Sequence, residues 1–228
     1  YGDSGNALIL AERARRRGID AEVLHVGLTE EIPDSLDIYT LGGGEDTAQA
    51  LAADKFRGTS GLARALDAGR PLLAICASLQ VLGHWYEDAR GARVPGMGVL
   101  DITTRPQGHR AIGELICEPV LEGLTQTLTG FENHGGGTVL GPEASPLGRV
   151  ISGVGNGTPQ GEEAPEVRYD GAVQGSIIAT YMHGPALARN PELADLLLER
   201  ATGTTLEPLE VPGVAQLREE RLRIVRQA

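Results

Sequence analysis

Residues 71–83 read PLLAICASLQVLG, and this stretch decides the fold. The apolar run from Pro71 to Ile75 predicts a buried strand, and the apolar residues after Ser78 predict a helix. A lone cysteine, Cys76, stands at the corner between them. In a nucleophile elbow, a strained strand-to-helix turn holds a reactive side chain toward the substrate. A buried core cysteine is common in proteins and suits the same residues, so both interpretations stand at this point.

Strands and helices alternate around this corner. We expect helices over residues 7–17, 46–53 and 60–68 and strands over residues 21–26, 35–41 and 71–75. Such alternation with short loops predicts an α/β fold, with a mostly parallel central sheet and helices on both faces.

The second half of the chain has a different pattern. Alternating and glycine-broken apolar runs predict an antiparallel extension with strands over residues 99–104, 112–117 and 130–140. Residues 152–167 contain few apolar side chains and predict a long, mobile surface loop. We expect a strand over 172–182, a helix capped by Asn190 with Pro191 in its first turn, and a last helix over 217–225.

Composition narrows the class of protein. The 228 residues are 41% hydrophobic, and we find no linker or repeat, so we expect a single domain over residues 1–228. The net charge of −11 argues against nucleic acid or an anionic membrane as a partner. Two cysteines suit a reducing, cytoplasmic compartment, and no apolar run is long enough to embed the chain in a membrane. No spacing of paired ligands predicts a metal site.

The first residues form a turn that leads into a helix. Because a strand usually precedes such a turn, we expect a segment before Tyr1 that adds one strand to the sheet.

Three chemically distinctive features follow predicted strands: Cys76, the triglycine Gly42–Gly44, and His183. The carboxyl ends of parallel strands meet at one edge of a sheet, so we expect the three to converge there. Taken singly, each has a structural alternative. The triglycine also suits a tight turn and lacks the Lys-Ser/Thr ending of a phosphate loop, and His183 also suits a core position.

Cys76 needs a basic partner if it is a nucleophile. A free thiol has a pKa of about 8.5, and lowering it by about 2 units requires about 2.7 kcal/mol. A helix N-terminus supplies only about 0.3–1 kcal/mol. A neighbouring histidine would supply the rest, and His183 is the best placed of the five in the chain.

At this point the motifs resemble those of the class I glutamine amidotransferases. Their elbow motif is Cys-x-Gly/Ala-x-Gln, and the chain has CASLQ over residues 76–80, with Ser78 as the departure. The motifs GFENH (130–134) and TYMHGP (180–185) resemble the cobyric-acid-synthase-like branch. YGDSGN (1–6) and GVGN (153–156) are similar to those of the glutaminase subunits of lipid II isoglutaminyl synthases. The resemblance covers essentially the whole chain.

The resemblance implies a flavodoxin-like fold and the hydrolysis of glutamine to glutamate and ammonia. Cys76 would attack the side-chain amide, and His183 would transfer the protons. The N–H groups of Ala77 and Gly43 would form the oxyanion hole. Three further side chains would contact L-glutamine: Gln80, Arg110 and His134.

The resemblance also implies a partner. Ammonia would pass to an ATP-dependent ligase subunit of Mur-ligase type in a heterodimer. That subunit would amidate D-glutamate to D-isoglutamine in the peptidoglycan stem peptide of lipid II, at the cytoplasmic face of the membrane, for cell wall biogenesis and cell shape. This chain would carry no cofactor, because ATP and Mg²⁺ would bind the partner. The alternatives are a glutaminase for corrinoid amidation, another cysteine hydrolase on the same fold, and an inactive binding module.

Most class I relatives carry an acidic residue two positions after the catalytic histidine, and this chain does not. Here that position is Pro185. We therefore expect a Cys–His dyad whose histidine is oriented by an acid of the partner, with Glu132 as the alternative within this chain. Cys117 lies in a predicted strand without such a context, and we expect it to be inert.

Overall fold

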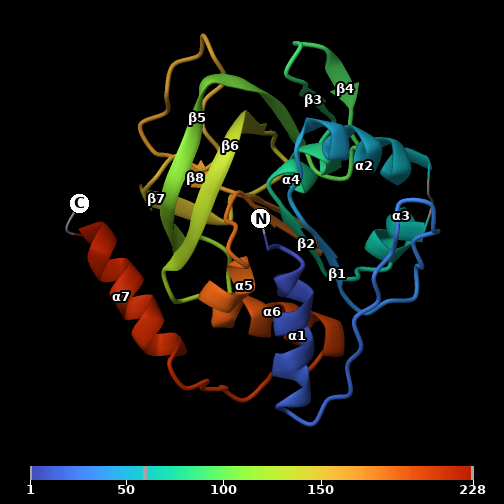
Figure 1. Ribbon diagram of the computed structural model, residues 1–228, viewed down its shortest axis with the longest axis vertical. Coiled ribbons are helices and arrows are strands. Elements are labelled where there is room, and N and C mark those ends of the chain that lie inside the picture. Colours follow the sequence, from blue (N-terminus) through green and yellow to red (C-terminus); the bar gives the residue numbers. More distant parts are fainter. Residues whose placement is uncertain (1, 59–60, 227–228) are drawn as a thin grey trace.

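The computed structural model describes residues 2–58 and 61–226 and contains two sheets (Figure 1). The first sheet has the strand order β1-β2-β10-β9, where β1 is Tyr39–Leu41, β2 is Leu72–Ile75, β10 is Ile177–Thr180 and β9 is Ala172–Gln174. β2 is parallel to β1 and β10, and β9 is antiparallel to β10. Every residue of β2 and β10 is buried, as expected for strands covered on both faces.

The second sheet is built on a long antiparallel hairpin of β5 (Ile102–Pro119) and β6 (Leu128–Leu140). Four shorter strands continue it: β3 (Trp85–Glu87), β4 (Arg93–Pro95), β7 (Gly148–Ser152) and β8 (Tyr169–Asp170). The hairpin register shifts between Pro106 and Ala111. The prediction of an antiparallel extension is therefore confirmed.

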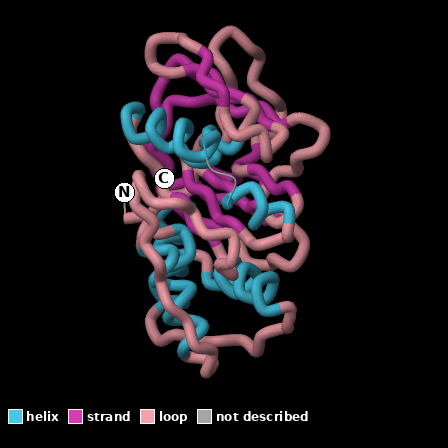
Figure 2. Tube along the Cα trace, turned by 90° about the vertical axis from the view of Figure 1, so that its right-hand side faces the viewer, coloured by secondary structure: helices cyan, strands magenta, loops and turns pink. Residues whose placement is uncertain are grey.

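Seven helices are described: α1 (Gly5–Arg15), α2 (Asp46–Gly58), α3 (Gly61–Asp67), α4 (Ala77–Leu82), α5 (Ala186–Arg189), α6 (Pro191–Thr202) and α7 (Val214–Arg226). Helix α4 packs on β2, β10 and α2, whereas α1 packs on α5 and α6. Figure 2 shows helices on both sides of the central strands. Within the described ranges, no helix has the length and apolar character needed to cross a membrane.

Residues 21–26 do not form the predicted strand. Ala21 and Val26 pack against the core, but the segment has no ladder partner among the described residues. Alternating apolar residues indicate that one face of a segment is buried. A strand also requires a neighbouring strand that forms hydrogen bonds with its backbone N–H and C=O groups. The prediction over 172–182 also needs correction, because a turn at Gly175, which has φ +58°, divides it into β9 and β10.

Asn190 precedes α6 as predicted, but its side chain does not cap the helix. Its amide bonds the N–H and C=O of Thr129 and the C=O of Ala186 instead, which ties α5 and β6 together. Part of the predicted surface loop is also fixed in the interior. Gly155 and Asn156 are buried, and the Asn156 side chain exchanges two hydrogen bonds with Gly171.

Candidate active site

Cys76 lies between β2 and α4 in a strained backbone conformation, with φ 52° and ψ −106°. It is the one non-glycine residue with positive φ among the described residues. Such a conformation costs about 1–3 kcal/mol and persists only where the surroundings enforce it. Here the N–H of Cys76 donates to the C=O of Thr180 at 2.8 Å, and its C=O accepts from the N–H of Gln80 at 3.3 Å. This geometry is that of a nucleophile elbow.

The three predicted features converge at this elbow. A Cβ placed on Gly43 would lie 2.7 Å from Cε1 of His183 and 3.4 Å from Cβ of Cys76. Only a glycine leaves room for the histidine ring at this distance. Ser78, which departs from the family motif, donates its hydroxyl to the C=O of Gly42 at 2.6 Å. That bond ties the elbow helix to the triglycine.

An acid of this chain orients His183, contrary to our expectation. The Nδ1–H of His183 donates to Asp3, at 2.9 Å from Oδ2 and 3.2 Å from Oδ1. Both side chains are buried. When Nδ1 carries the hydrogen, Nε2 is the ring nitrogen that can accept a proton. Asp3 belongs to the opening YGDSGN motif, which we had used only for the resemblance, and 180 residues separate it from His183.

The other acid that we had considered, Glu132, does not bond His183. Its two carboxylate oxygens accept the N–H groups of Val154 and Gly155, at 2.7 and 2.9 Å. The structure therefore replaces the predicted dyad with the set Asp3, His183 and Cys76, all from this chain.

The pKa values of Asp3 and Cys76 are shifted in opposite directions. Burial raises the pKa of the Asp3 carboxyl, but hydrogen bonds from His183 and Gly43 outweigh it and leave the pKa below its usual value. Burial raises the pKa of Cys76 to about 12, against the opposing effects of the Ala77 N–H and of the positive charge of Arg110. The resting sulfur therefore holds its proton, and a role as nucleophile would require a base to remove that proton.

One predicted oxyanion donor is engaged elsewhere. The N–H of Gly43 donates to Oδ2 of Asp3 at 2.9 Å, so Gly43 does not offer it to a substrate in this structure. The N–H of Ala77 is directed at the sulfur of Cys76, where its hydrogen bond favours the thiolate. Ala77 therefore stays a predicted oxyanion donor, and the N–H of Gly43 holds the Asp3 carboxylate.

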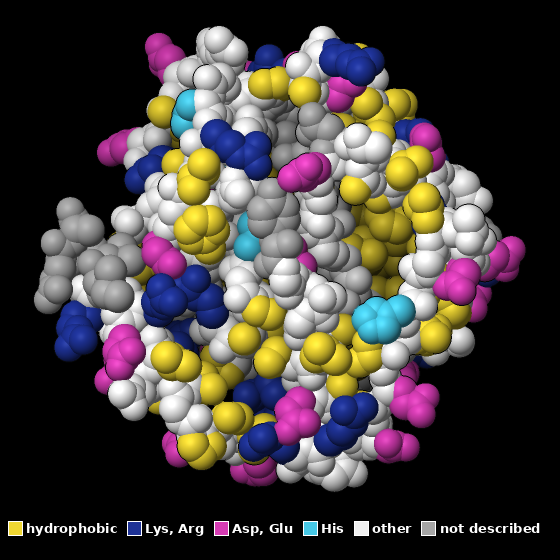
Figure 3. Space-filling model, viewed as in Figure 1, with side chains coloured by type: hydrophobic (Ala, Val, Ile, Leu, Met, Phe, Trp, Pro, Cys, Tyr) yellow, Lys and Arg dark blue, Asp and Glu magenta, His cyan; other side chains and the backbone are white. Residues whose placement is uncertain are grey.

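The three predicted substrate contacts have different surroundings. Arg110 is exposed, lies next to the register shift of β5 and donates from Nε to Oδ1 of Asn133 at 2.7 Å. Figure 3 shows dark blue and yellow side chains gathered on this face over β5 and β6. Gln80 is buried, with Oε1 accepting from Gln49 at 2.7 Å and Nε2 donating to the Tyr181 hydroxyl at 3.0 Å.

His134 does not line an open site, and we correct that prediction. Only 1% of its side chain is exposed, and its ring stacks on Tyr181 with 3.8 Å between ring centroids. The glycine-rich context that suggested a binding loop is instead a strand, β6, whose even-numbered residues 132 and 134 face the interior. Among the described residues, no group of three or more His, Cys, Asp or Glu side chains is arranged to hold a metal ion.

Residues 1–191 match the model of the CobB/CobQ-like glutamine amidotransferase domain. The chain belongs to this family. It is 36% identical to the lipid II isoglutaminyl synthase (glutamine-hydrolyzing) subunit GatD of Staphylococcus aureus, over 99% of this chain and 90% of that protein. It is 35% identical to the GatD subunit of Streptococcus pneumoniae, over 88% of this chain and 75% of that protein.

The chain also matches cobyric acid synthases, but over a smaller share of their length. A probable cobyric acid synthase of Methanothermobacter thermautotrophicus is 33% identical over 66% of this chain but only 31% of that protein. Among solved structures, a glutamine amidotransferase aligns with a TM-score of 0.56 and 19% identity over 86% of this chain and 93% of that chain. The predicted class I glutamine amidotransferase fold is confirmed, and the chain is an enzyme of the glutamine amidotransferase type.

Proposed function

We propose that this chain is the glutaminase subunit of a lipid II isoglutaminyl synthase. The observation that carries the proposal is its identity of 35–36% with two GatD subunits over most of both their lengths. The proposed product is ammonia, which a partner subunit uses to convert D-glutamate to D-isoglutamine in the stem peptide of lipid II.

The proposed reaction begins when Cys76 attacks the side-chain amide carbon of glutamine. His183 takes the thiol proton on Nε2 and passes it to the leaving ammonia. Asp3 holds Nδ1–H and stabilises the imidazolium that forms, as the acid does in hydrolase triads. The Ala77 N–H supports the oxyanion. Water then hydrolyses the thioester, with His183 as the base, to give glutamate and free Cys76.

Substrate recognition rests on the charge of Arg110. Its guanidinium is exposed yet close enough to affect the Cys76 thiol, which suits a role in binding the carboxylate of glutamine. The side chain of Gln80 is hydrogen-bonded to Gln49 and Tyr181. We therefore propose that Gln80 stabilises the elbow and does not contact glutamine directly.

The proposed partner is an ATP-dependent synthetase of Mur-ligase type that forms a heterodimer with this subunit. ATP and Mg²⁺ bind that partner in this proposal, and the glutaminase chain needs no cofactor. In this proposal the complex acts on lipid II in the cytoplasm, at the inner face of the membrane. Its product contributes to cell wall biogenesis and cell shape.

A second candidate is a glutaminase for corrinoid amidation, favoured only by the similarity to cobyric acid synthases. The chain spans just 31% of the M. thermautotrophicus protein, whereas it spans 90% of the S. aureus subunit. A cysteine hydrolase with another substrate, or an inactive module, would not release glutamate. A glutamine-like electrophile that labels Cys76 would argue against both.

The test uses the reconstituted complex with its Mur-ligase-type partner. The Cys76→Ser variant is expected to abolish glutamine-dependent amidation of lipid II, while ammonium salts still support amidation. Cys117→Ala is the control, because Cys117 is the other buried free cysteine, lies on β5 and takes no part in the proposed reaction. Glutamine-dependent turnover by Cys76→Ser would contradict the mechanism, and turnover of a corrinoid precursor in place of lipid II would contradict the assigned product.

A further inference from the structure

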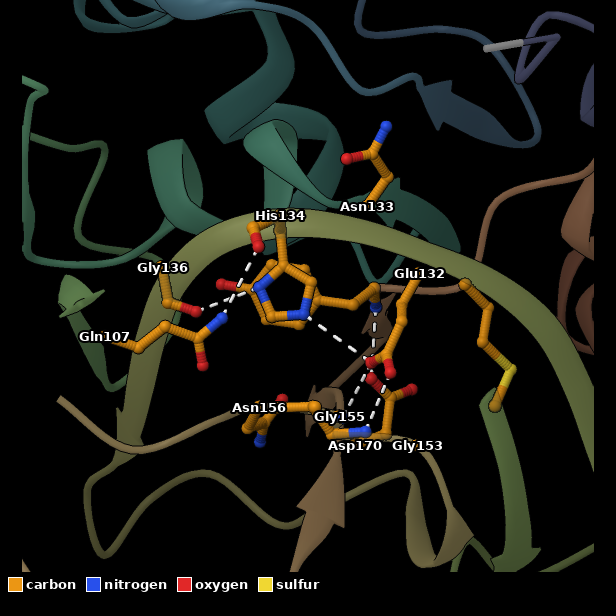
Figure 4. A network of polar contacts seen from close by, with 12 residues as sticks. Gln107, Glu132, Asn133, His134, Gly136, Gly153, Gly155, Asn156 and Asp170 are labelled. Carbon is orange, nitrogen blue, oxygen red and sulfur yellow. Dashed lines mark hydrogen bonds and ion pairs between the residues drawn. The ribbon is translucent and has the colours of Figure 1, made fainter. Parts of the chain in front are cut away.

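A buried cluster of titratable groups lies behind the elbow and takes no part in the proposed reaction. It consists of Glu132 and His134 on β6, Asp170 on β8 and Tyr181 just after β10, all nearly or fully inaccessible to solvent. Figure 4 shows Glu132 and Asp170 side by side, with the His134 ring next to them. A buried ionisable group destabilises the folded state unless it is paired, so we expect the members of this cluster to stabilise one another.

The hydrogen bonds of this cluster indicate the charge of His134. Its Nδ1 lies 2.9 Å from the carbonyl oxygen of Gly136, which can only accept, so Nδ1 carries a hydrogen. Its Nε2 is buried, has no hydrogen-bond partner and lies 3.7 Å from Oε2 of Glu132. A lone pair on Nε2 would face a carboxylate oxygen, whereas a proton there would form an ion pair.

The surroundings of Glu132 provide two donors to its carboxyl group. Each of its oxygens accepts a backbone N–H, from Val154 and from Gly155. Two such bonds favour a carboxylate over a carboxylic acid. Gly153 and Gly155 have φ +98° and +69°, the conformations that turn successive N–H groups toward one anion. A negative Glu132 in turn favours a positive His134.

The His134 ring connects this ion pair to the elbow. It stacks on Tyr181 with 21° between the ring planes, an arrangement that attracts a cation to an aromatic face. The Tyr181 hydroxyl accepts from Nε2 of Gln80 and lies 2.7 Å from Oγ1 of Thr138. Gln80 is also the residue whose N–H bonds the C=O of Cys76. An unbroken series of contacts therefore leads from Glu132 to the nucleophile.

We propose that His134 is a positioning residue for the nucleophile. Held as an imidazolium by Glu132, it fixes the ring of Tyr181, and Tyr181 fixes the side chain of Gln80 under the strained elbow. The strain at Cys76 is enforced from two sides, by the C=O of Thr180 and by this series. The proposal rests on Cys76 as the nucleophile. If Cys76→Ser still hydrolyses glutamine, the proposed function fails, whatever the His134 variants do.

The kinetic test uses the His134→Phe variant in the subunit bound to its partner. Phenylalanine can still stack on Tyr181 but carries no charge and cannot pair with Glu132. We expect kcat for glutamate release to fall about 10- to 100-fold with KM nearly unchanged, since misplaced reactive groups impair the chemical step. The matched control is His84→Phe, which removes a histidine that pairs with Asp101 on the surface, and it should leave both constants unchanged.

A spectroscopic test addresses the charge directly and does not depend on the folding of His134→Phe. The imidazole ¹⁵N signals of His134 in the wild-type subunit at pH 7 should be those of an imidazolium. In Glu132→Gln they should become those of a neutral ring, with a parallel loss of kcat. A neutral His134 in the wild type, or folded His134→Phe and Glu132→Gln variants with wild-type kcat, would overturn the proposal.

Discussion

Asp3 and Cys76, the two ionisable groups next to the His183 ring, differ in their resting protonation state. Asp3 stays ionised because His183 and Gly43 both donate to it, and Cys76 stays protonated because it is buried. In the proposed reaction the proton therefore starts on sulfur and would move to His183 only during the attack on glutamine. This differs from the preformed thiolate that a helix N-terminus and an imidazolium would produce.

The alkylation rate of Cys76 in the resting subunit should rise with pH well beyond 8.5. Burial favours the neutral thiol and raises its pKa to about 12, so the thiolate fraction keeps increasing through pH 10. The measurement is iodoacetamide labelling in the Cys117→Ala background, followed by mass spectrometry at successive pH values. A plateau reached by pH 7 would instead indicate a stable thiolate–imidazolium pair.

Gly43→Ala should lower glutamate release about 100-fold and lower the free energy of unfolding by about 1–3 kcal/mol, the usual cost of overpacking a buried site. The added Cβ would lie 2.7 Å from Cε1 of the His183 ring, and a buried ring pushed out of place costs about this factor. Steady-state kinetics and thermal unfolding measure the two effects. Gly58→Ala is the control, because no atom of the described residues outside its own helix and chain neighbours lies within 4 Å of the added Cβ. Wild-type kcat in Gly43→Ala would show that the ring does not need this position.

At the scale of elements, the sequence correctly predicted the helices and strands whose formation depends on a local pattern of apolar residues and glycines. The elbow strand and helix, the triglycine after β1 and the strand β6 lie where their apolar patterns placed them. The prediction failed where strand formation depends on hydrogen bonds with a neighbouring strand. Residues 21–26 are the example, because they have no ladder partner among the described residues. Asp3 was missed for a related reason, because its contact with His183 depends on how distant segments pack and not on local spacing.

Asp170 should make the stability of the β8–β10 region dependent on pH. Burial raises its pKa to about 6, despite hydrogen bonds from Thr180 and Tyr181. The native state then binds the proton more tightly than the unfolded chain does. The stabilisation from this carboxyl is fully present below its unfolded pKa of 3.8 and is lost as pH rises through about 6.

Asp170→Asn removes this titration. The difference in the free energy of unfolding between wild type and Asp170→Asn should therefore shift in favour of the variant as pH rises from 4 to 7. Urea unfolding at pH 4, 5.5 and 7 measures it, and effects of the other carboxyls cancel in the difference. A difference that is constant over this range would contradict the raised pKa.

For the whole molecule, contacts between α1 and the helices α5 and α6 hold the proposed catalytic set together. Asp3 lies just before α1, and α1 packs against α5 and α6, which follow His183. Arg13 of α1 donates to both carboxylate oxygens of Asp195 in α6, at 2.7 and 2.6 Å, and Arg17 adds a bond at 2.9 Å. These ion pairs fix the N-terminal segment that carries Asp3 against α6, which follows His183 along the chain.

Asp195→Asn should lower the free energy of unfolding by about 2–3 kcal/mol. It leaves the buried guanidinium of Arg13 without its counter-ion, and removal of one partner from a buried pair is strongly destabilising. Asp34→Asn, which breaks an exposed pair with Arg64, is the matched control and should cost about 1 kcal/mol or less. Equal losses in urea unfolding would mean that the Arg13–Asp195 pair contributes no more than a surface pair.

The most direct test is glutamate release by the isolated subunit, compared between the wild type and Asp3→Asn. Asp101→Asn, which alters the surface pair with His84, is the control for an Asp-to-Asn change beside a histidine. With the complete set Asp3, His183 and Cys76 in this chain, the wild type and the control should hydrolyse glutamine, and kcat of Asp3→Asn should fall about 10³- to 10⁴-fold. Equal rates for the wild type and Asp3→Asn, or hydrolysis that begins only when the partner is added, would contradict this account.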